Sequence, residues 1–236
     1  MISSMPKWMG DLFSNALRPN MKILSVELLS PQIKRVRFHG DNSKMNAAIG
    51  HANFIRVTET EYRNYTTAYH NKQEGILDII FHIHGKGPGS RYADSLKAGD
   101  EIFISPPRGK KLYDPKARKQ FIFGDETALG LSYSFLPVLE QARHEFQFYF
   151  ELEEENKNIP HLLGLKNYTV FPKDGSFGNE KWISELPVFQ ATGWRDASFV
   201  LVGNAKSVQA FRKVLKNGNA SKVISQGYWL EGKRGL

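Results

Sequence analysis

Short strand patterns dominate residues 22 to 105, and no long helical pattern interrupts them. Two of these patterns are separated only by Ser30-Pro31-Gln32, which predicts an antiparallel hairpin. An open antiparallel sheet leaves unpaired edges that closure removes, so the run predicts a closed antiparallel β-barrel. A short helix at 90–96 is expected to cap it. The expected strands include 22–29, 33–38, 54–58, 65–70 and 76–83.

From about residue 116 the pattern changes to short apolar strands that alternate with helical segments. Such alternation predicts a parallel sheet covered by helices. We expect Pro137 to break or restart the first helix, and Gly218 to end the last one. The expected strands are 120–123, 146–152, 168–171 and 198–202, and the expected helices are 127–143, 159–164, 181–186 and 207–216.

The chain is therefore divided into a barrel domain at 21–115 and an α/β domain at 116–236 that ends in a basic tail. Residues 1–20 are expected to contain an amphipathic helix that packs on protein. Its apolar stripe consists of Trp8, Met9, Leu12, Phe13, Ala16 and Leu17.

Composition narrows the chemistry. The absence of cysteine excludes disulfides, thiol redox chemistry, iron–sulfur clusters and cysteine zinc sites, so electron transfer would need a bound organic cofactor.

No apolar run reaches the roughly 18 residues of a membrane span, and the N-terminus lacks a secretory pattern, so a cytoplasmic protein without membrane insertion is expected. The formal net charge of +8 allows an anionic partner: a nucleic acid, a nucleotide or an anionic metal chelate.

Residues 63–92 contain two candidate phosphate-binding elements with one strand between them. The first is Arg63-Asn64-Tyr65-Thr66, and the second is the turn Gly85-Lys86-Gly87-Pro88-Gly89-Ser90. Glycines let backbone N–H groups approach an anion, and a helix start adds further donors, which suits a pyrophosphate. His82 and His84 share a strand face, but two histidines without a third ligand make a weak metal site, and none is expected.

The order of these motifs resembles that of siderophore-interacting proteins, which are FAD-dependent ferric-siderophore reductases of the ferredoxin-reductase superfamily. The resemblance continues through Pro106-Pro107-Arg108-Gly109, the segment 124–129 and the closing Gly227-Tyr228-Trp229. It covers roughly residues 21–232. It implies an N-terminal antiparallel flavin-binding β-barrel followed by a C-terminal α/β parallel-sheet domain of nucleotide-binding type.

The resemblance also implies roles for individual residues. Arg63 would bind the FAD pyrophosphate, Tyr65 would lie against the flavin ring and Thr66 would reach flavin N5, which makes Tyr65 and Thr66 the residues at the reacting ring. A second arginine of the family pattern is replaced by Ala68, for which Lys86 or Arg91 could substitute. The other implied cofactor contacts are His84, Gly87, Gly89, Ser90, Asp125, Thr127 and Ala128.

Asp125 and Glu126 also have a structural interpretation. Two carboxylates at a helix start stabilise the helix dipole but would repel a pyrophosphate there, and the Rossmann glycine fingerprint is absent. The resemblance implies a nicotinamide dinucleotide or ferredoxin as the electron donor. Should a dinucleotide bind, the acidic run of Glu151, Glu153, Glu154 and Glu155 predicts a preference for NADH over NADPH.

The function implied by the resemblance is reduction of a ferric siderophore to release iron(II), with no nucleic acid as partner. The expected contacts to an anionic chelate are Lys233 and Arg234, with Arg108 and Lys110 as further candidates. The alternative is a non-catalytic barrel that binds a ligand or a nucleic acid through its basic surface.

Overall fold

The computed structural model describes residues 18–233 except 44, 191–192 and 221. The chain divides into two compact units between Lys111 and Leu112, a few residues before the expected boundary, and each unit is described by itself. The amphipathic stripe expected near the N-terminus and the candidate residue Arg234 lie outside the described residues.

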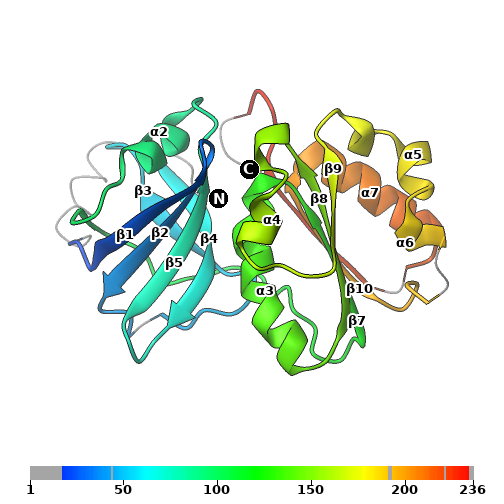
Figure 1. Cartoon of the computed structure of the whole chain (residues 1–236), viewed down its shortest axis with the longest axis horizontal. Helices are drawn as coiled ribbons and strands as arrows, with labels where there is room; N and C mark the ends of the chain where they lie inside the picture. Colours follow the sequence, from blue (N-terminus) through cyan, green and yellow to red (C-terminus); the bar gives the residue numbers. More distant parts are fainter. Residues whose placement is uncertain (1–17, 44, 191–192, 221, 234–236) are drawn as a thin grey trace. The chain divides into compact units, whose positions relative to one another are not determined.

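The N-terminal domain is an antiparallel sheet that curls and closes on itself (Figure 1). Its strands are β1 (Met21–Ser30), β2 (Ile33–Gly40), β3 (Ala52–Arg56), β4 (Tyr62–Asn71), β5 (Ile76–His82) and β6 (Glu101–Ile102). They lie in the order β3-β4-β5-β2-β1-β6. Bridges between Ile55 and Ile104 and between Ala52 and Arg108 join β3 to the segment that follows β6. The two ends of the sheet therefore meet, which confirms the expected barrel.

Local chemistry explains the first hairpin. The hydroxyl oxygen of Ser30 accepts hydrogen bonds from the backbone N–H groups of Gln32 (3.1 Å) and Ile33 (3.0 Å), so the turn is closed by its own first residue. β1 then pairs with β2 in antiparallel register, with Val26 opposite Val36. The expected hairpin is confirmed.

A buried polar network supports closure of the barrel. Asn53 is fully buried, and its amide nitrogen donates to the Ser105 carbonyl at 2.7 Å. Its amide oxygen accepts from the Thr67 hydroxyl, also at 2.7 Å. A buried amide needs hydrogen-bond partners, and here both partners lie on other segments. The two bonds therefore join β3 to β4 and to the segment after β6. Apolar side chains such as Phe38, Ile79 and Phe81 fill the rest of the interior.

The C-terminal domain is a parallel sheet with helices on both faces (Figure 1). The strand order is β11-β10-β7-β8-β9, with β7 (Lys119–Gly124), β8 (Glu145–Leu152), β9 (Tyr168–Pro172), β10 (Ser198–Asn204) and β11 (Lys222–Trp229). α3 (Leu129–Gln141) and α4 (Ile159–Leu162) cover one face, and α5 (Glu180–Ser184), α6 (Pro187–Gln190) and α7 (Ala205–Asn217) cover the other. Short 3₁₀ helices are η1 (Glu126–Ala128), η2 (Glu154–Asn156) and η3 (Ser176–Gly178).

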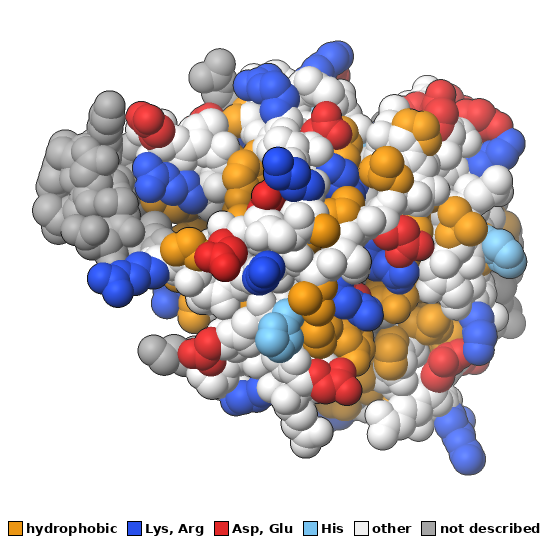
Figure 2. Space-filling view, turned by 60° about the vertical axis from the view of Figure 1, so that its left-hand side comes forward, with side chains coloured by type: hydrophobic (Ala, Val, Ile, Leu, Met, Phe, Trp, Pro, Cys, Tyr) orange, Lys and Arg blue, Asp and Glu red, His pale blue; other side chains and the backbone are white. Residues whose placement is uncertain are grey.

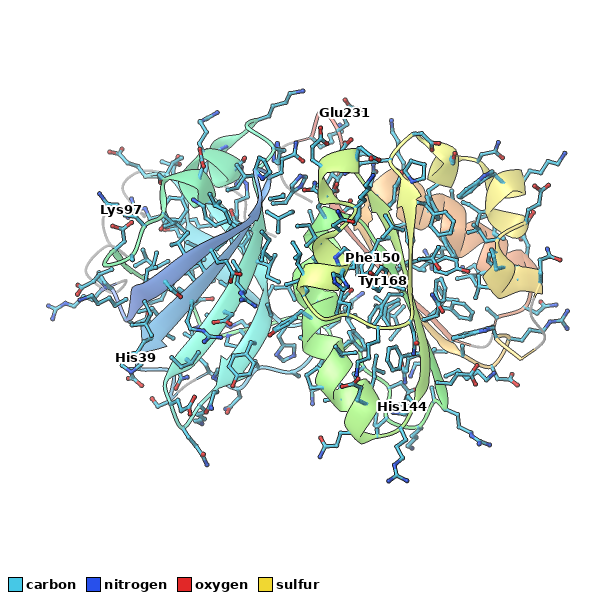
Figure 3. The ribbon with its side chains drawn as sticks, in the orientation of Figure 1. His39, Lys97, His144, Phe150, Tyr168 and Glu231 are labelled. Carbon is cyan, nitrogen blue, oxygen red and sulfur yellow. The ribbon has the colours of Figure 1, made fainter. Side chains whose placement is uncertain are left out.

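Aromatic side chains fill both faces of this sheet. Phe121 and Phe123 pack against Phe211 of α7 with ring centroids 5.6 and 4.9 Å apart. On the opposite face, Phe148 and Phe150 stack with nearly parallel rings, and Figure 3 shows Phe150 among the side chains between the sheet and the helices. Burial of the central strands on both faces accounts for their continuous apolar sequences.

Two sequence expectations are corrected. Pro137 does not break a helix, because α3 runs through it from Leu129 to Gln141. The buried residues Leu131, Phe135 and Leu139 recur every four positions on both sides of the proline, so packing on the sheet maintains the helix despite one missing N–H. The second correction is β11, which the sequence analysis did not identify as a strand. It is half-buried along its length and pairs with β10 alone.

The surface carries no single dominant charge on the face that Figure 2 presents, where Lys and Arg side chains lie among acidic and apolar ones. Within the described part of the chain, no helix is both long and apolar enough to cross a membrane.

Candidate functional site

The two motifs of residues 63–92 meet in the structure. α2 (Pro88–Ser95) begins at the glycine-rich turn. A Cβ atom added at Gly89 would lie 2.8 Å from the Tyr65 hydroxyl oxygen and 3.1 Å from Cγ of Arg63. Real Cβ contacts are almost never so short, so a larger residue at position 89 would displace the Tyr65 or Arg63 side chain. The Arg-x-Tyr strand and the glycine-rich helix start therefore form one site.

Tyr65 links the strand to the helix. Its hydroxyl donates to the Gly89 carbonyl at 3.2 Å, and its ring meets Phe81 edge-on with centroids 4.6 Å apart. Burial raises the pKa of Tyr65 far above its usual value of 10.0. The phenol therefore stays neutral and keeps its role as a donor.

The turn before α2 is held by its own residues. The Ser90 hydroxyl oxygen accepts from the backbone N–H groups of His84 and Gly85, each at 3.0 Å. Gly85 and Gly87 have φ values of +73° and +81°, a conformation that side chains other than glycine rarely adopt. No side chain caps the N-terminus of α2, and the first N–H groups of a helix lack intrahelical partners. The structure thus leaves an uncapped, glycine-lined helix start, which fits a pyrophosphate.

Arg63 is oriented by its neighbours on β4. Its guanidinium donates to the Tyr62 carbonyl at 2.8 Å and to the Glu61 carboxylate at 3.2 Å, with 22% of the side chain exposed. The position of the missing second arginine is occupied by Ala68, which is buried in the barrel. The two candidate substitutes, Lys86 and Arg91, are exposed at the turn and on α2.

Thr66 and His84 lie at the margin of this site. Thr66 is half-buried and pairs with Ala52 on β3; in the pleat of β4 it faces the side opposite to Tyr65. The exposed His84 accepts from Lys86 N–H at 3.3 Å through Nδ1, and its ring centroid lies 5.5 Å from that of His82. Within the described residues, no group of three or more His, Cys, Asp and Glu side chains is arranged to hold a metal ion.

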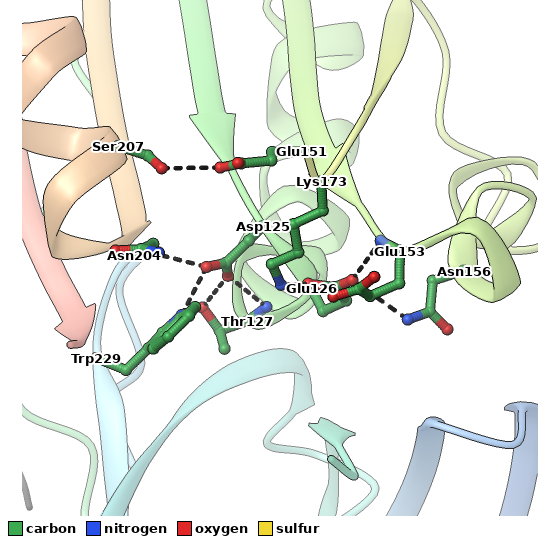
Figure 4. A network of polar contacts seen from close by, with 10 residues as sticks. All are labelled: Asp125, Glu126, Thr127, Glu151, Glu153, Asn156, Lys173, Asn204, Ser207 and Trp229. Atoms are coloured by element: carbon green, nitrogen blue, oxygen red, sulfur yellow. Dashed lines mark hydrogen bonds and ion pairs between the residues drawn. The ribbon is translucent and has the colours of Figure 1, made fainter. Parts of the chain in front are cut away.

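The other predicted contacts lie in the C-terminal domain, where side chains from several strand ends converge on Asp125 (Figure 4). One of its carboxylate oxygens accepts from the Thr127 N–H at 2.9 Å. The other accepts from the Asn204 N–H at 2.8 Å and the Trp229 indole N–H at 2.6 Å. Asp125 is 1% exposed and caps η1, so the predicted capping role is confirmed. Ala128 is fully buried behind it.

Glu126 forms the second half of this network. Its carboxylate accepts from the Glu153 N–H at 2.8 Å and pairs with the Lys173 ammonium at 2.5 Å. That ammonium also lies 5.4 Å from the centre of the Trp229 ring (Figure 4). Burial opposes the charge of Lys173, but the carboxylates of Asp125 and Glu126 outweigh it and hold the pKa of Lys173 above its usual value.

Glu151 is not part of the acidic surface that the sequence suggested. It is 3% exposed, and its carboxylate accepts from the Ser207 hydroxyl at 2.9 Å. Burial raises the pKa of Glu151 above its usual value. Glu153 and Glu155 remain exposed, and Glu154 is exposed and paired with Lys157. The correction follows from the pleat of β8, which turns Glu151 inward just before the chain leaves the sheet.

The candidate substrate contacts are exposed. The side chains of Arg108 and Lys110 are exposed on the N-terminal domain, where the backbone of Arg108 pairs with Ala52. Lys233 is exposed in the C-terminal domain.

Sequence reasoning missed Lys173, Asn204 and the inward role of Trp229. Each lies at or just after the carboxyl end of a parallel strand. Open α/β sheets place their functional side chains at that edge. Polar residues directly after predicted strands could therefore have been identified from the sequence as candidate site residues. For Trp229 that signal was hidden, because its strand was not predicted.

Known proteins resemble this chain in sequence and in fold. Residues 50–111 match the family model described as the siderophore-interacting FAD-binding domain. A segment of 58 residues is 36% identical to NADH-cytochrome b5 reductase 1 of Dictyostelium discoideum; it covers 25% of this chain and spans only 20% of that relative's length.

Solved structures show the same fold across both domains. A siderophore-interacting protein from Acinetobacter baumannii has a TM-score of 0.72 at 21% identity, with 91% of each chain covered. A ferredoxin NADP+ reductase from Neisseria gonorrhoeae has a TM-score of 0.71 at 14% identity, with 90% of this chain and 99% of that chain covered. The chain therefore has the fold of these structures, and residues 50–111 within it match the family model of the siderophore-interacting FAD-binding domain.

Proposed function

We propose that the protein is an FAD-dependent oxidoreductase that reduces the iron(III) of a siderophore-type chelate. The observation that carries the proposal is the meeting of Arg63 and Tyr65 with the uncapped start of α2 at Gly89. The stem of Arg63 passes the start of α2, so its guanidinium can add charge-assisted donors to those of the helix N-terminus, and an aromatic ring on the same strand provides a face for a flat ring system.

The chain's own residues bind and orient the cofactor. Arg63 and the N–H groups at the start of α2 hold the pyrophosphate, with Gly87, Gly89 and Ser90 shaping the turn. Tyr65 lies toward the ring, and Thr66, on the opposite face of β4, contributes from the margin of the site. When bound, FAD accepts electrons in pairs and delivers them singly, which no side chain of this cysteine-free chain can do. A two-electron donor therefore serves two chelates, because each iron(III) takes one electron.

Iron release follows from ligand preference. Hard oxygen ligands hold iron(II) more weakly than iron(III), so reduction loosens the chelate without an acid–base pair from the protein. The anionic chelate would be attracted by exposed cations, for which Lys233, Arg108 and Lys110 are the described candidates and Arg234 lies next in the sequence. The electron donor is a nicotinamide dinucleotide or ferredoxin.

The decisive experiment is an absorption spectrum of the purified protein, followed by titration of the apoprotein with FAD. A flavin spectrum and stoichiometric FAD uptake are expected, and the reduced protein should then convert a ferric siderophore to iron(II) that a ferrous chelator traps. A protein that stays colourless in excess FAD would refute the proposal and favour the non-catalytic binding module.

A further inference from the structure

Lys34 on β2 is a buried lysine at the other end of the phosphate-binding helix. Only 4% of Lys34 is exposed, yet it lies in a domain whose other interior residues are mostly apolar. Its ammonium donates to the carbonyls of Ala93 and Asp94, at 3.0 and 2.5 Å. A buried charge is retained only where such partners compensate for its loss of water.

The two carbonyls belong to the last turn of α2, where helix geometry leaves carbonyl groups without intrahelical partners. A third, that of Tyr92, accepts from the Ser95 hydroxyl at 2.8 Å. α2 has no basic residue of its own in this turn, so Lys34 supplies the cation that a helix C-terminus favours. The helix end is therefore satisfied from a strand that lies more than fifty residues earlier in the sequence.

The opposite end of α2 is anchored differently. The Tyr65 hydroxyl bonds the Gly89 carbonyl, and the Ser90 hydroxyl bonds the turn before the helix. Neither bond uses the N–H groups that face out of the first turn, and no side chain caps them. The helix is thus fixed along its length while its anion-binding end stays open, an arrangement that reduces the entropy lost when an anion binds.

We propose that Lys34 is a positioning residue for the pyrophosphate of FAD: by holding the last turn of α2, it keeps the N–H groups of the first turn in place. The proposal rests on the proposed function, because it assumes that this helix start receives the pyrophosphate. The nearby Asp94 carboxylate, 4.0 Å away and 70% exposed, contributes little, so the effect belongs to the bonds with the carbonyls.

The test compares Lys34→Met with Lys97→Met. Lys97 is exposed just after α2 and points away from the barrel (Figure 3), so its replacement removes the same charge without touching the helix end. FAD affinity is measured by titration of each apoprotein. Lys34→Met should weaken FAD binding about tenfold or more, because the lost bonds involve a charged donor, and Lys97→Met should leave it unchanged.

A second readout separates positioning from general loss of stability. Hydrogen exchange of the apoproteins should show faster exchange in Lys34→Met within residues 85–96, with the strands of the barrel unchanged. If Lys34→Met does not yield folded protein, Lys34→Gln carries the same comparison, since it keeps a donor but no charge.

The possible outcomes are distinct. Equal FAD affinity in wild type and Lys34→Met would overturn the role of Lys34 and leave the proposed function standing. Weaker affinity with faster exchange across every strand of the barrel would also overturn it, because Lys34 would then act through global stability. Wild-type protein that binds no FAD would refute the proposed function itself, and the positioning role with it.

Discussion

Arg63, the proposed pyrophosphate ligand, is held in place by its neighbours. Its aliphatic stem passes beside Gly89, and bonds to the Tyr62 carbonyl and the Glu61 carboxylate orient its guanidinium. A fixed guanidinium loses less entropy when it binds a phosphate than a freely rotating one would. The pair with Glu61 is partly solvated, so it adds little to folding stability.

We therefore expect Arg63→Ala to lower the affinity for FAD by about one to two decades, the value of one charge-assisted hydrogen bond. The free energy of unfolding of the apoprotein should change little. Titration with FAD and urea denaturation measure the two quantities. Arg56→Ala is the control, since that guanidinium bonds only the nearby carbonyls of Thr58 and Glu59 among its described contacts. Unchanged FAD affinity in Arg63→Ala would contradict the assignment.

Glu151 makes stability depend on pH. Because burial raises the pKa of Glu151 above its usual value near 4.5, the folded domain binds this proton more tightly than the unfolded chain does. The stabilisation is present below the usual pKa and is lost as the pH rises through the raised pKa.

Glu151→Gln removes this titration and keeps an acceptor for the Ser207 hydroxyl. We expect the free energy of unfolding of the variant to rise relative to wild type as the pH increases from about 4 to about 7. Urea denaturation across this range measures the difference. Glu155→Gln, on the exposed surface of η2 after β8, controls for the lost charge. A difference that shrinks toward pH 7 would show that burial of Glu151 does not favour its neutral form.

At the scale of elements, the carboxyl ends of β7 and β10 approach closely because both carry glycine. A Cβ at Gly124 would lie 2.3 Å from that of Ala128, and one at Gly203 would lie 2.8 Å from the carboxylate of Asp125. These glycines let Asp125 reach the backbone of Asn204 and the indole of Trp229. The strand ends are thus joined by one carboxylate.

Gly203→Ala should destabilise the C-terminal domain by about 2 to 4 kcal/mol, through both strain and the clash with Asp125. Gly164→Ala is the matched control. Gly164 also has a positive φ, +68° against +105° for Gly203, but open space lies around its Cβ position. Strain alone should cost the control about 1 kcal/mol. Denaturant unfolding measures the free energy of unfolding of both variants. An equal decrease in the two would show that the contact with Asp125 is unimportant.

At the scale of the whole molecule, each domain supplies a different part of the proposed reaction. The barrel carries the proposed FAD-binding elements, and the α/β domain carries a carboxyl edge filled by the network around Asp125 and Glu126. Carboxylates at this turn disfavour a pyrophosphate there, so a dinucleotide would have to bind by other contacts.

The acidic residues after β8 lead to a prediction about which dinucleotide donates electrons. With Glu151 buried, three exposed carboxylates, Glu153, Glu154 and Glu155, remain after β8. Like-charge repulsion should disfavour a 2′-phosphate beside them, so NADH should reduce the bound flavin faster than NADPH. Stopped-flow reduction at equal concentrations measures both rates, and Glu153→Gln should narrow the difference. Faster reduction by NADPH contradicts the prediction, whereas reduction by neither indicates a protein donor such as ferredoxin.

The net charge of +8 on the whole chain should attract an anionic substrate. Replacing Lys233 and Arg234 by glutamine should raise the apparent KM for an anionic ferric chelate about two- to tenfold at low salt, with a smaller effect at high salt. FAD content should not change. Lys216→Gln, on the exposed face of α7, controls for net charge. A KM that rises equally in the control would assign the effect to overall charge.

The sequence alone determined the two-domain order, the first hairpin, the approximate position of most strands and the pairing of the two motifs in residues 63–92. These features are encoded locally. The patterns that predict them extend over only a few residues: strand and helix periodicities, turn residues, and glycines that end an element. They can therefore be recognised without knowing the fold. The resemblance to a family then linked the motifs to FAD.

Tertiary structure alone decided which charges are buried and what they contact. Lys34 meets α2 from 59 residues away, and Asp125 holds Trp229 from 104 residues away. Glu151 faces inward although its sequence neighbours are solvated. β11 forms because β10 offers it a partner, and α3 continues through Pro137 because the sheet supports it. In each case the stabilising interaction is with a partner distant in sequence, so a local sequence pattern cannot predict it.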